Sequence, residues 1–491
     1  GMSIKTPLTA ILLSVATLVA AAQAYDTSYV GIHQAESEHY SRITGNLHTS
    51  VELSPETPSL LKSRSAGTLT HKVYGWHPYW ADPMAYTFYD YNALSHIAYF
   101  SLEVDTATGG YTTLRGWDTT PVISYAHARG VKVTLTVTNF GSARNTELLT
   151  DTVKQWNLIN TVINQLQSRN GDGVNFDFES VPAAQKANMV SFCRRAVTGI
   201  KAVLPEAEIS LATPAVNWSD GWDLGALAGI CDYIIMMGYN YYWSGSSTAG
   251  PVAPISGETY NITKSINDDY LADGVSPGKL LLGVPWYGYD WPVTSSIRKA
   301  ATTGTGTSRI YNTALGLVAS NTRIFDNLTG VPYISYQTTQ WRQMWYDDST
   351  SLQIKSNFAR DMNLAGIGIW ALSYEAGRPE LWEGLKTAFI AGYTSSGESP
   401  AAEPAGDIQI IPNPVTEESV IRYTIAKRSY VTLRIYDTGG RLIASLAARV
   451  MEPGSYSEPL DAGYLSAGIY ICILETSEGR SALRFAVIKT K

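Results

Sequence analysis

The chain has 491 residues, a net charge of −7 from 43 acidic and 36 basic side chains, and 45% hydrophobic residues. It is longer than the about 250 residues that one α/β barrel absorbs, so we expect more than one domain. The acidic balance and the lack of a dense Lys/Arg run argue against a nucleic-acid partner, and the large apolar share excludes general disorder.

The first residues have the pattern of an export signal. Lys5 supplies a positive start, Leu8–Ala22 is apolar, and Ala22-Gln23-Ala24 has the small-x-small form of a cleavage site. We predict a signal peptide over residues 1–24; the alternative is a membrane anchor, for which about 15 apolar residues are short. The three cysteines lie far apart and no metal-ligand spacing occurs, so we predict no disulfide framework, no metal and no cofactor.

Residues 25–70 are polar and mixed, with a possible helix around Gln34–Ile43, and we assign no function to this extension. From Lys72 onward apolar runs alternate with helical stretches, which is the pattern of βα units. The expected strands are Lys72–Trp80, Ser95–Leu102, Val131–Asn139, Gly173–Glu179, Glu208–Val216, Tyr233–Tyr239, Lys279–Trp286 and Gly366–Leu372. Eight such strands predict an α/β fold, a (β/α)8 TIM barrel over residues 71–392, with a small insertion at Asp290–Trp341 before the last strand.

An open doubly wound sheet is the alternative, but no Gly-rich phosphate-binding motif follows any of these strands. Residues 393–407 form a polar linker with Pro and Gly. Beyond it, residues 408–491 show short alternating strands, which predict a small C-terminal antiparallel β-sandwich. The strands expected there are Ser419–Ile425, Val431–Tyr436, Arg441–Leu446, Gly468–Glu475 and Ala482–Ile488.

The strongest chemical signal is the segment Asp172–Glu179. Side chains alternate along a strand, so Asn175, Asp177 and Glu179 share one face, which points inward in a parallel barrel. Two buried carboxylates raise each other's pKa, and one of them is thereby kept protonated near neutrality, as a general acid requires. The alternative is a structural network in which the two carboxylates pair with Arg or cap loops.

Other strand ends carry aromatic residues. Met237 and Tyr239 share a face at the end of the sixth strand, so the Tyr239 phenol can reach the barrel mouth, whereas Met237 alone fits core packing. Scattered aromatics are usually core residues, but their repetition at strand ends favours a groove with stacking platforms, as a sugar polymer needs. These residues are Trp76, Tyr79, Trp80, Tyr99, Trp286, Tyr287, Trp291 and Trp370.

Together these motifs resemble glycoside hydrolase family 18, the chitinase family, over roughly residues 72–391. The carriers are the DxxDxDxE-like strand at Asp172–Glu179, Met237–Asn240, Leu282–Gly288, Trp345–Asp348 and Gly366–Trp370. The resemblance implies that Glu179 is the acid and base, that Asp177 orients the substrate's own 2-acetamido group, that Tyr239 donates a hydrogen bond to that group, and that Trp370 floors the reacting subsite. Asn175 and Asn240 replace aspartates of the family, and Asn175–Pro182 looks like the branch of spore-cortex-lytic N-acetylglucosaminidases.

The candidate site therefore has two groups. The catalytic group is Glu179, Asp177, Tyr239, Asn175 and Asp172, and the substrate-binding group is Trp370, Asn240, Met237, Tyr99, Trp76, Trp286 and Tyr287.

The C-terminal residues 410–491 are similar to the sorting domain of the type IX secretion system, with Pro412–Pro414, Val431–Leu442, Leu465–Tyr470 and Phe485–Lys489 as carriers. This resemblance implies passage through the periplasm to the outside or the cell surface, with the secretion machinery as a partner. The alternative is a carbohydrate-binding sandwich, although no Trp follows Trp382.

The combined reading is a secreted, retaining, monomeric glycosidase that cleaves β-linked N-acetylglucosamine polymers, such as chitin or chitooligosaccharides. Peptidoglycan and N-glycan cores are alternative substrates, and a non-catalytic carbohydrate-binding barrel is the alternative from another class.

Overall fold

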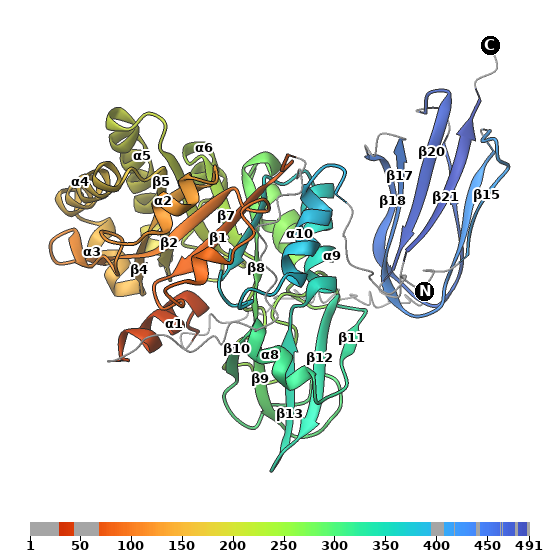
Figure 1. Cartoon of the computed structure of the whole chain (residues 1–491), viewed down its shortest axis with the longest axis horizontal. Helices are drawn as coiled ribbons and strands as arrows, with labels where there is room; N and C mark the ends of the chain where they lie inside the picture. The colour runs from red at the N-terminus through yellow and green to blue at the C-terminus, as the bar shows by residue number, and fades with distance from the viewer. Residues whose placement is uncertain are drawn as a thin grey trace, which may run out of the picture.

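A computed structural model of the chain describes residues 29–43, 68–393 and 407–488, except residues 417, 438–441, 462, 464 and 477–479. The predicted signal peptide and almost all of the predicted linker lie outside these residues. Figure 1 shows three bodies: a barrel with helices around it, a sheet subdomain beside the barrel, and a separate sandwich at the C-terminal end. No helix among the described residues is long and apolar enough to cross a bilayer.

The predicted TIM barrel is confirmed. Eight parallel strands pair in sequence order, and the first strand pairs with both the second and the last, which closes the ring. The strands are β1 Lys72–Pro78, β2 His96–Asp105, β4 Lys132–Phe140, β5 Gly173–Glu179, β6 Glu208–Pro214, β7 Tyr233–Met237, β8 Leu280–Pro285 and β14 Gly366–Trp370, and β3 Gly110–Thr113 extends β2 as a hairpin. The barrel strands are buried on both faces, because helices cover the outside and side chains fill the inside.

Helices and single turns connect the barrel strands. They are η1 Ala85–Thr87, α2 Val122–His127, α3 Ser142–Leu149, α4 Thr152–Arg169, η2 Ala183–Gln185, α5 Lys186–Val203, α6 Leu224–Ile230, α7 Ile262–Lys264, η3 Ser265–Leu271, η4 Pro277–Lys279, α9 Ser349–Asp361 and α10 Glu380–Phe389. Asp151 caps the N-terminus of the long helix α4, and its carboxylate accepts hydrogen bonds from the backbone N–H groups of Val153 and Lys154.

The insertion before the last barrel strand is a sheet subdomain, as the length of that connection predicted. It contains β9 Tyr287–Val293, β10 Thr307–Ile310, α8 Tyr311–Val318, β11 Ile324–Asp326, β12 Val331–Gln337 and β13 Trp341–Tyr346. Its five strands form an antiparallel sheet in the order β10-β9-β13-β12-β11. The buried Asp290 on β9 pairs with Arg309 and Arg342, which fixes neighbouring strands of the sheet to each other.

The C-terminal sandwich has two antiparallel sheets, β15-β16-β19 and β18-β17-β20-β21. Its strands are β15 Ile408–Ile411, β16 Val420–Ile425, β17 Ser429–Asp437, β18 Leu442–Met451, β19 Gly454–Pro459, β20 Gly468–Glu475 and β21 Arg480–Val487. The sequence did not predict the edge strands β15 and β19, because β15 has only four residues and β19 consists mainly of polar residues. The sandwich has a hydrophobic core of its own, with Val431, Leu433 and Ile435 at its centre.

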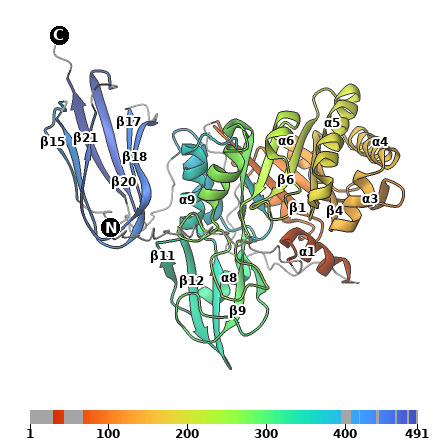
Figure 2. The same cartoon turned by 180° about the vertical axis from the view of Figure 1, so that it is seen from behind.

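The N-terminal extension contains one described helix, α1 Ile32–Ser41, close to the predicted Gln34–Ile43. Figures 1 and 2 show α1 beside the barrel, and the His33 ring lies with its centroid 5.2 Å from that of Trp76 on β1, the next described strand in the sequence. Its buried residues are mainly polar: His33, Glu36 and Ser37, with Ile32 as the apolar member. A helix that buries its polar face needs polar partners in the body that it contacts.

Candidate active site

The predicted alternation of β5 is present. Val174, Phe176 and Phe178 face the helices, where Phe178 stacks on Phe192 of α5 with ring centroids 5.4 Å apart. Asp177 and Glu179 face the opposite way, toward the carboxyl end of the barrel, where α1 covers them. The period of two in a strand is therefore what brings both carboxylates to one mouth.

Asp177 is fully buried and has two neighbours of different origin. Its Oδ2 lies 2.7 Å from Nδ1 of His33 in α1, and the same imidazole lies 2.7 Å through Nε2 from the hydroxyl of Tyr239. The second carboxylate oxygen of Asp177 is buried with no hydrogen-bond partner among the described residues.

Glu179 is 7% exposed, and one of its carboxylate oxygens also has no partner among the described residues. Burial raises the pKa of Glu179 well above its usual value, and the charge of Asp177 raises it further. A hydrogen bond from the backbone N–H of Gln34, in the first turn of α1, acts in the opposite direction on this pKa. A carboxyl group that keeps its proton near neutrality beside an acceptor-only carboxylate is suited to general acid catalysis.

Asn175 lies one step deeper on the same face of β5. Its Oδ1 accepts a hydrogen bond of 3.0 Å from the indole N–H of Trp76, and its Nδ2 donates to the hydroxyl of Ser210 at 2.9 Å. An amide can serve one donor and one acceptor at once, which explains why a neutral side chain fits here. Asn175 therefore supports the site floor without carrying a charge.

Two tyrosines and an asparagine form the wall opposite Glu179. The hydroxyl of Tyr287 donates to Oδ1 of Asn240 at 2.5 Å, and the rings of Tyr287 and Tyr239 meet edge to face with centroids 6.1 Å apart. Burial raises the pKa of Tyr239 well above its usual value, and the charges of Asp177 and Glu179 add to this shift. Tyr239 is thus held as a neutral hydrogen-bond donor above the carboxylates.

Trp370, the last residue of β14, forms an aromatic floor. Phe100 and Trp80 pack edge-on around it, at centroid distances of 5.0 and 6.2 Å. The imidazole of His33 is stacked on the Trp370 indole with centroids 3.6 Å apart. The indole therefore offers one face toward Asp177 and Tyr239.

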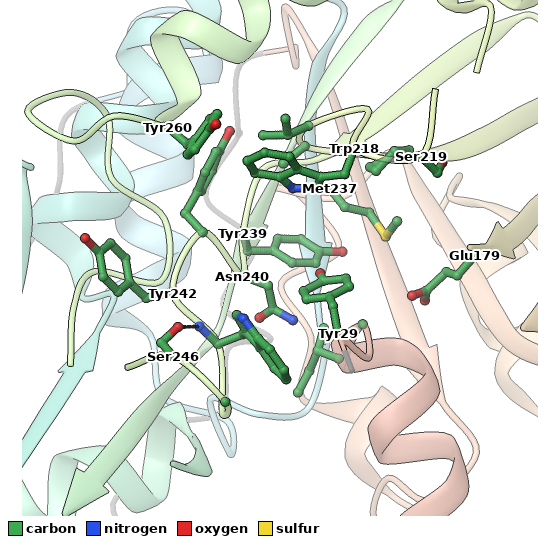
Figure 3. A pocket seen from close by; sticks show the side chains of 18 of the residues that line it. Tyr29, Glu179, Trp218, Ser219, Met237, Tyr239, Asn240, Tyr242, Ser246 and Tyr260 are labelled. Atoms are coloured by element: carbon green, nitrogen blue, oxygen red, sulfur yellow. Dashed lines mark hydrogen bonds between the residues drawn. The ribbon is translucent and has the colours of Figure 1, made fainter. Parts of the chain in front are cut away.

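A cavity of about 550 Å³ begins at Glu179 and continues past Tyr239 and Asn240. Figure 3 shows Glu179 at one side, Tyr29 and Tyr239 in the middle, and Tyr260 and Tyr242 at the far side. Met237 lines the same cavity. The sequence did not single out Trp218, Tyr260 or Tyr29, because these residues are on loops and not at strand ends.

Three of the predicted site residues lie elsewhere. Asp172 precedes β5 at the opposite end of the barrel, about 20 Å along the strand, where it contacts His127 and the backbone N–H of Val133.

Tyr99 donates to the backbone carbonyl of Arg115 and packs on Trp117, outside the mouth. Trp286 is fully buried against Trp382 of α10. These three are corrected: Tyr99 and Trp286 lie on the outer face, and Asp172 precedes the strand at the opposite end and, by the period of two, shares the outward face of Val174 and Phe176.

Three residues of α1 also belong to the site and were not predicted from the sequence: His33, Glu36 and Tyr40. Glu36 accepts hydrogen bonds from the Trp370 indole at 2.9 Å and from the Tyr374 hydroxyl at 2.5 Å. Tyr40 stacks on Trp80 with centroids 4.8 Å apart. The available signal was the spacing i, i+3, i+7, which puts all three on one helix face, but nothing in the sequence indicated that this face meets the barrel.

His33, Asp177 and Glu179 also form a group whose potential metal-ligand atoms lie within 4.8 Å of one another. The hydrogen bond between His33 and Asp177 accounts for this proximity, so we assign no ion to the group.

The family described as glycosyl hydrolases family 18 matches residues 72–375, the whole barrel with its insertion. The chain belongs to this family. The family resemblance read from the sequence is thereby confirmed, and the barrel is that of a glycoside hydrolase.

Several relatives share the barrel. The chain is 28% identical over 260 residues to the putative sporulation-specific glycosylase YdhD of Bacillus subtilis, covering 50% of this chain and 58% of that protein. It is 27% identical over 309 residues to human di-N-acetylchitobiase, covering 55% and 76% of the two chains. The cortical fragment-lytic enzyme of Bacillus subtilis is 24% identical over 255 residues, 49% of this chain and 55% of that protein. The chain thus spans about three fifths of the length of the two Bacillus relatives.

Solved structures share the fold. The family 18 chitinase of Cycas revoluta in complex with (GlcNAc)4 superposes with a TM-score of 0.59 and 18% identity, over 65% of this chain and 99% of that chain. A group IV chitinase of Ostrinia furnacalis in complex with allosamidin gives 0.59 and 19%, over 65% and 97%.

Residues 409–489 match the secretion system C-terminal sorting domain. This match confirms the resemblance read from the sequence and indicates that the chain is exported to the cell surface or the outside.

Proposed function

We propose that the chain is a retaining glycosidase that hydrolyses β-linked N-acetylglucosamine in chitin or chitooligosaccharides by substrate-assisted catalysis. The observation that carries this proposal is the convergence of Glu179, Asp177 and Tyr239 above the indole of Trp370. A protonated carboxyl, an ionised carboxylate and a phenol donor are the three groups that this chemistry needs.

In the first step Glu179 gives its proton to the glycosidic oxygen as the bond from the anomeric carbon to that oxygen breaks. The carbonyl oxygen of the substrate's 2-acetamido group forms the new bond to the anomeric carbon. Asp177 accepts a hydrogen bond from the acetamido N–H and stabilises the positive charge that develops there, while Tyr239 donates to the acetamido oxygen.

In the second step the Glu179 carboxylate takes a proton from water, and the water oxygen attacks the anomeric carbon. The bond between the anomeric carbon and the acetamido oxygen breaks, which restores the acetamido group. Two displacements at one carbon retain the β configuration. Because Asn175 is neutral and already hydrogen-bonded on both sides, Asp177 acts without a second aspartate to share its proton.

The test is product analysis by proton NMR. The full chain and a Glu179→Gln variant are incubated with N-acetyl-chitooligosaccharides, and we expect β-anomeric products from the first and turnover lower by about 10²–10⁴-fold in the second. Cello-oligosaccharides, which lack the acetamido group, serve as the control substrate and should remain intact. Full activity of the Glu179→Gln variant, or cleavage of the control substrate, would contradict the proposal.

Peptidoglycan is a second candidate substrate. Two of the relatives are named as a sporulation-specific glycosylase and a cortical fragment-lytic enzyme, and the cavity wall is rich in aromatic rings that stack on any sugar polymer. The same NMR experiment is run in parallel with purified peptidoglycan and with an N-glycan core. It shows which of these saccharides the enzyme cleaves. Binding of one of these saccharides without cleavage would favour a non-catalytic carbohydrate-binding barrel.

A further inference from the structure

The N-terminal helix α1 fills the site proposed for the reacting sugar. His33 lies between Asp177 and Tyr239 and is stacked on Trp370, and its side chain is completely buried. Glu36, one turn later, occupies the indole N–H of Trp370. No sugar can contact Asp177, Tyr239 and Trp370 while these two side chains are in place, because the three groups are already in contact with α1.

The imidazole of His33 has the hydrogen-bonding pattern of an acetamido group. In the tautomer that carries its proton on Nδ1, the imidazole donates to the Asp177 carboxylate and accepts at Nε2 from the Tyr239 hydroxyl. An acetamido group likewise presents one N–H donor and one acceptor oxygen, and in both groups a single carbon separates the two polar atoms. The flat imidazole also stacks on the Trp370 indole as a sugar face does.

The start of α1 covers the acid. Gly31 lies so close to Glu179 that a Cβ built on it would be 1.8 Å from the carboxylate Oε2, and the backbone N–H of Gln34 donates to the same carboxylate. The N-terminus of a helix is a favourable place for a carboxylate. Glycine at position 31 is therefore what permits this close approach.

Outside the site, α1 makes few contacts with the barrel. Its remaining contacts with the barrel are the buried Ile32 and the stack of Tyr40 on Trp80, and Gln34, Glu38 and Arg42 contact one another on the exposed side. The buried side chains of this ten-residue helix are mostly polar and find their partners in the site. An isolated helix of this length is marginal in water, so α1 depends on the site for its stability.

We propose that residues 29–41 are an intramolecular inhibitor, a pseudosubstrate in which His33 replaces the 2-acetamido group and α1 closes the reacting subsite until it is displaced. The inference rests on the proposed function, because it takes Asp177, Tyr239 and Trp370 as the subsite of the reacting sugar. The covalent link favours inhibition, because binding of a segment of the same chain is intramolecular.

A segment that competes with substrate and a segment that only supports the barrel differ in their effects on KM and kcat. A segment that competes with substrate reduces the fraction of open enzyme, so it raises KM and leaves kcat unchanged. Release of α1 should therefore lower KM at least tenfold without a change in kcat. A segment that merely supports the barrel would, on removal, lower kcat or the melting temperature instead.

The experiment uses the full chain and matched variants. His33→Ala/Glu36→Ala removes the two contacts that fill the site, and Glu38→Ala/His39→Ala removes the same residue types from the exposed side of α1. Gly31→Glu is an independent way to displace the segment, because a second carboxylate cannot occupy the space next to Glu179. KM and kcat are measured with N-acetyl-chitotetraose, and the Kd for allosamidin, a ligand in the Ostrinia furnacalis structure, is measured by calorimetry.

We expect KM and the allosamidin Kd to fall at least tenfold in His33→Ala/Glu36→Ala and in Gly31→Glu, and to stay at the wild-type value in Glu38→Ala/His39→Ala. A synthetic peptide of residues 29–42 should restore the high KM competitively in the released variants, and the same peptide with Ala at positions 33 and 36 should not. Hydrogen exchange of the α1 amides reports its release directly.

Two results would overturn the inference in different ways. If wild type and the released variants have the same KM and the same allosamidin Kd, the proposed function stands and the inhibitor does not exist. If exchange shows that α1 is released but no variant cleaves chitotetraose or binds allosamidin, the proposed function fails and the inference fails with it.

Discussion

The two ends of the chain attach to the barrel by different physics. The C-terminal sandwich has its own hydrophobic core, and an ion pair between Arg434 on β17 and Asp361 on α9 connects it to the barrel. The N-terminal helix α1 has no core, and its buried polar side chains are satisfied by residues of the active site. The C-terminal end is a domain stabilised by the burial of apolar area, whereas the N-terminal helix is held, as a ligand would be, by polar contacts with the site.

The first prediction concerns a variant that removes the contact of α1 with Asp177. Asp177→Ala removes the acceptor of His33 and the partner of the acetamido group together, so we expect turnover to fall by about 10²–10⁴-fold and α1 to lose protection against hydrogen exchange. The amides of the sandwich strands should not change. Retained protection of α1 in this variant would show that the helix does not depend on the site.

The second prediction concerns a variant in the hydrophobic core of the sandwich. Leu433 is fully buried in its core, so Leu433→Ala should destabilise this domain by about 2–5 kcal/mol. Chitotetraose hydrolysis and α1 exchange should remain at wild-type values, because the core of the barrel is separate. Calorimetric unfolding resolves the two domains, and Ile469→Ala, at an exposed position on the neighbouring strand β20, is the control.

The third prediction concerns pH and Glu36. Burial raises the pKa of Glu36 from 4.5 to about 7, while hydrogen bonds from Tyr374 and Trp370 lower it in part. A released Glu36 titrates near 4.5, so docking of α1 is strongest below that pH, weakens as the pH rises, and levels off above about 7. The total change is about 3 kcal/mol, at about 1.36 kcal/mol per pKa unit.

The measurement for this third prediction is the ratio of KM in wild type to KM in Gly31→Glu, taken between about pH 4.5 and 7.5, a window that brackets the free and docked pKa values. The ratio should fall with rising pH in the wild type and lose most of that slope in Glu36→Gln. The ratio is needed because α1 carries two other titratable groups near the site, His33 and Tyr40, and because further titratable groups of the barrel face it. These are Asp177, Glu179, Tyr239, Tyr287, Tyr289 and Tyr374. A slope that Glu36→Gln retains in full would assign the effect to those groups.

The smallest expected effect is at the contact between the sandwich and the barrel. Arg434→Ala leaves Asp361, whose pKa burial already raises, without its partner from β17, and we expect a loss of about 1–2 kcal/mol in barrel stability. Activity should not change. Arg449→Ala, which removes an exposed ion pair within the sandwich, is the control, and an equal effect of both variants would mean that the contact contributes nothing.

The barrel and its catalytic face followed from local patterns. The eight strands were visible because each is a short apolar run between turn signals, and the common face of Asp177 and Glu179 followed from the period of two in a strand. The sandwich strands β17 and β20 were found for the same reason, whereas the edge strand β15 is only four residues long and β19 consists mainly of polar residues, so neither gives a clear apolar pattern.

The sequence by itself therefore determined the fold class, the two carboxylates and the phenol of Tyr239, since each depends on neighbours within a few residues. Only the tertiary structure decided that Tyr99 and Trp286 face away from the mouth, and that Asp172 lies at the wrong end of β5. It alone also brought His33 to Asp177, across 144 positions of the chain. No periodicity encodes such a contact, because it depends on complementarity between a polar helix face and a polar site that sequence-distant strands assemble.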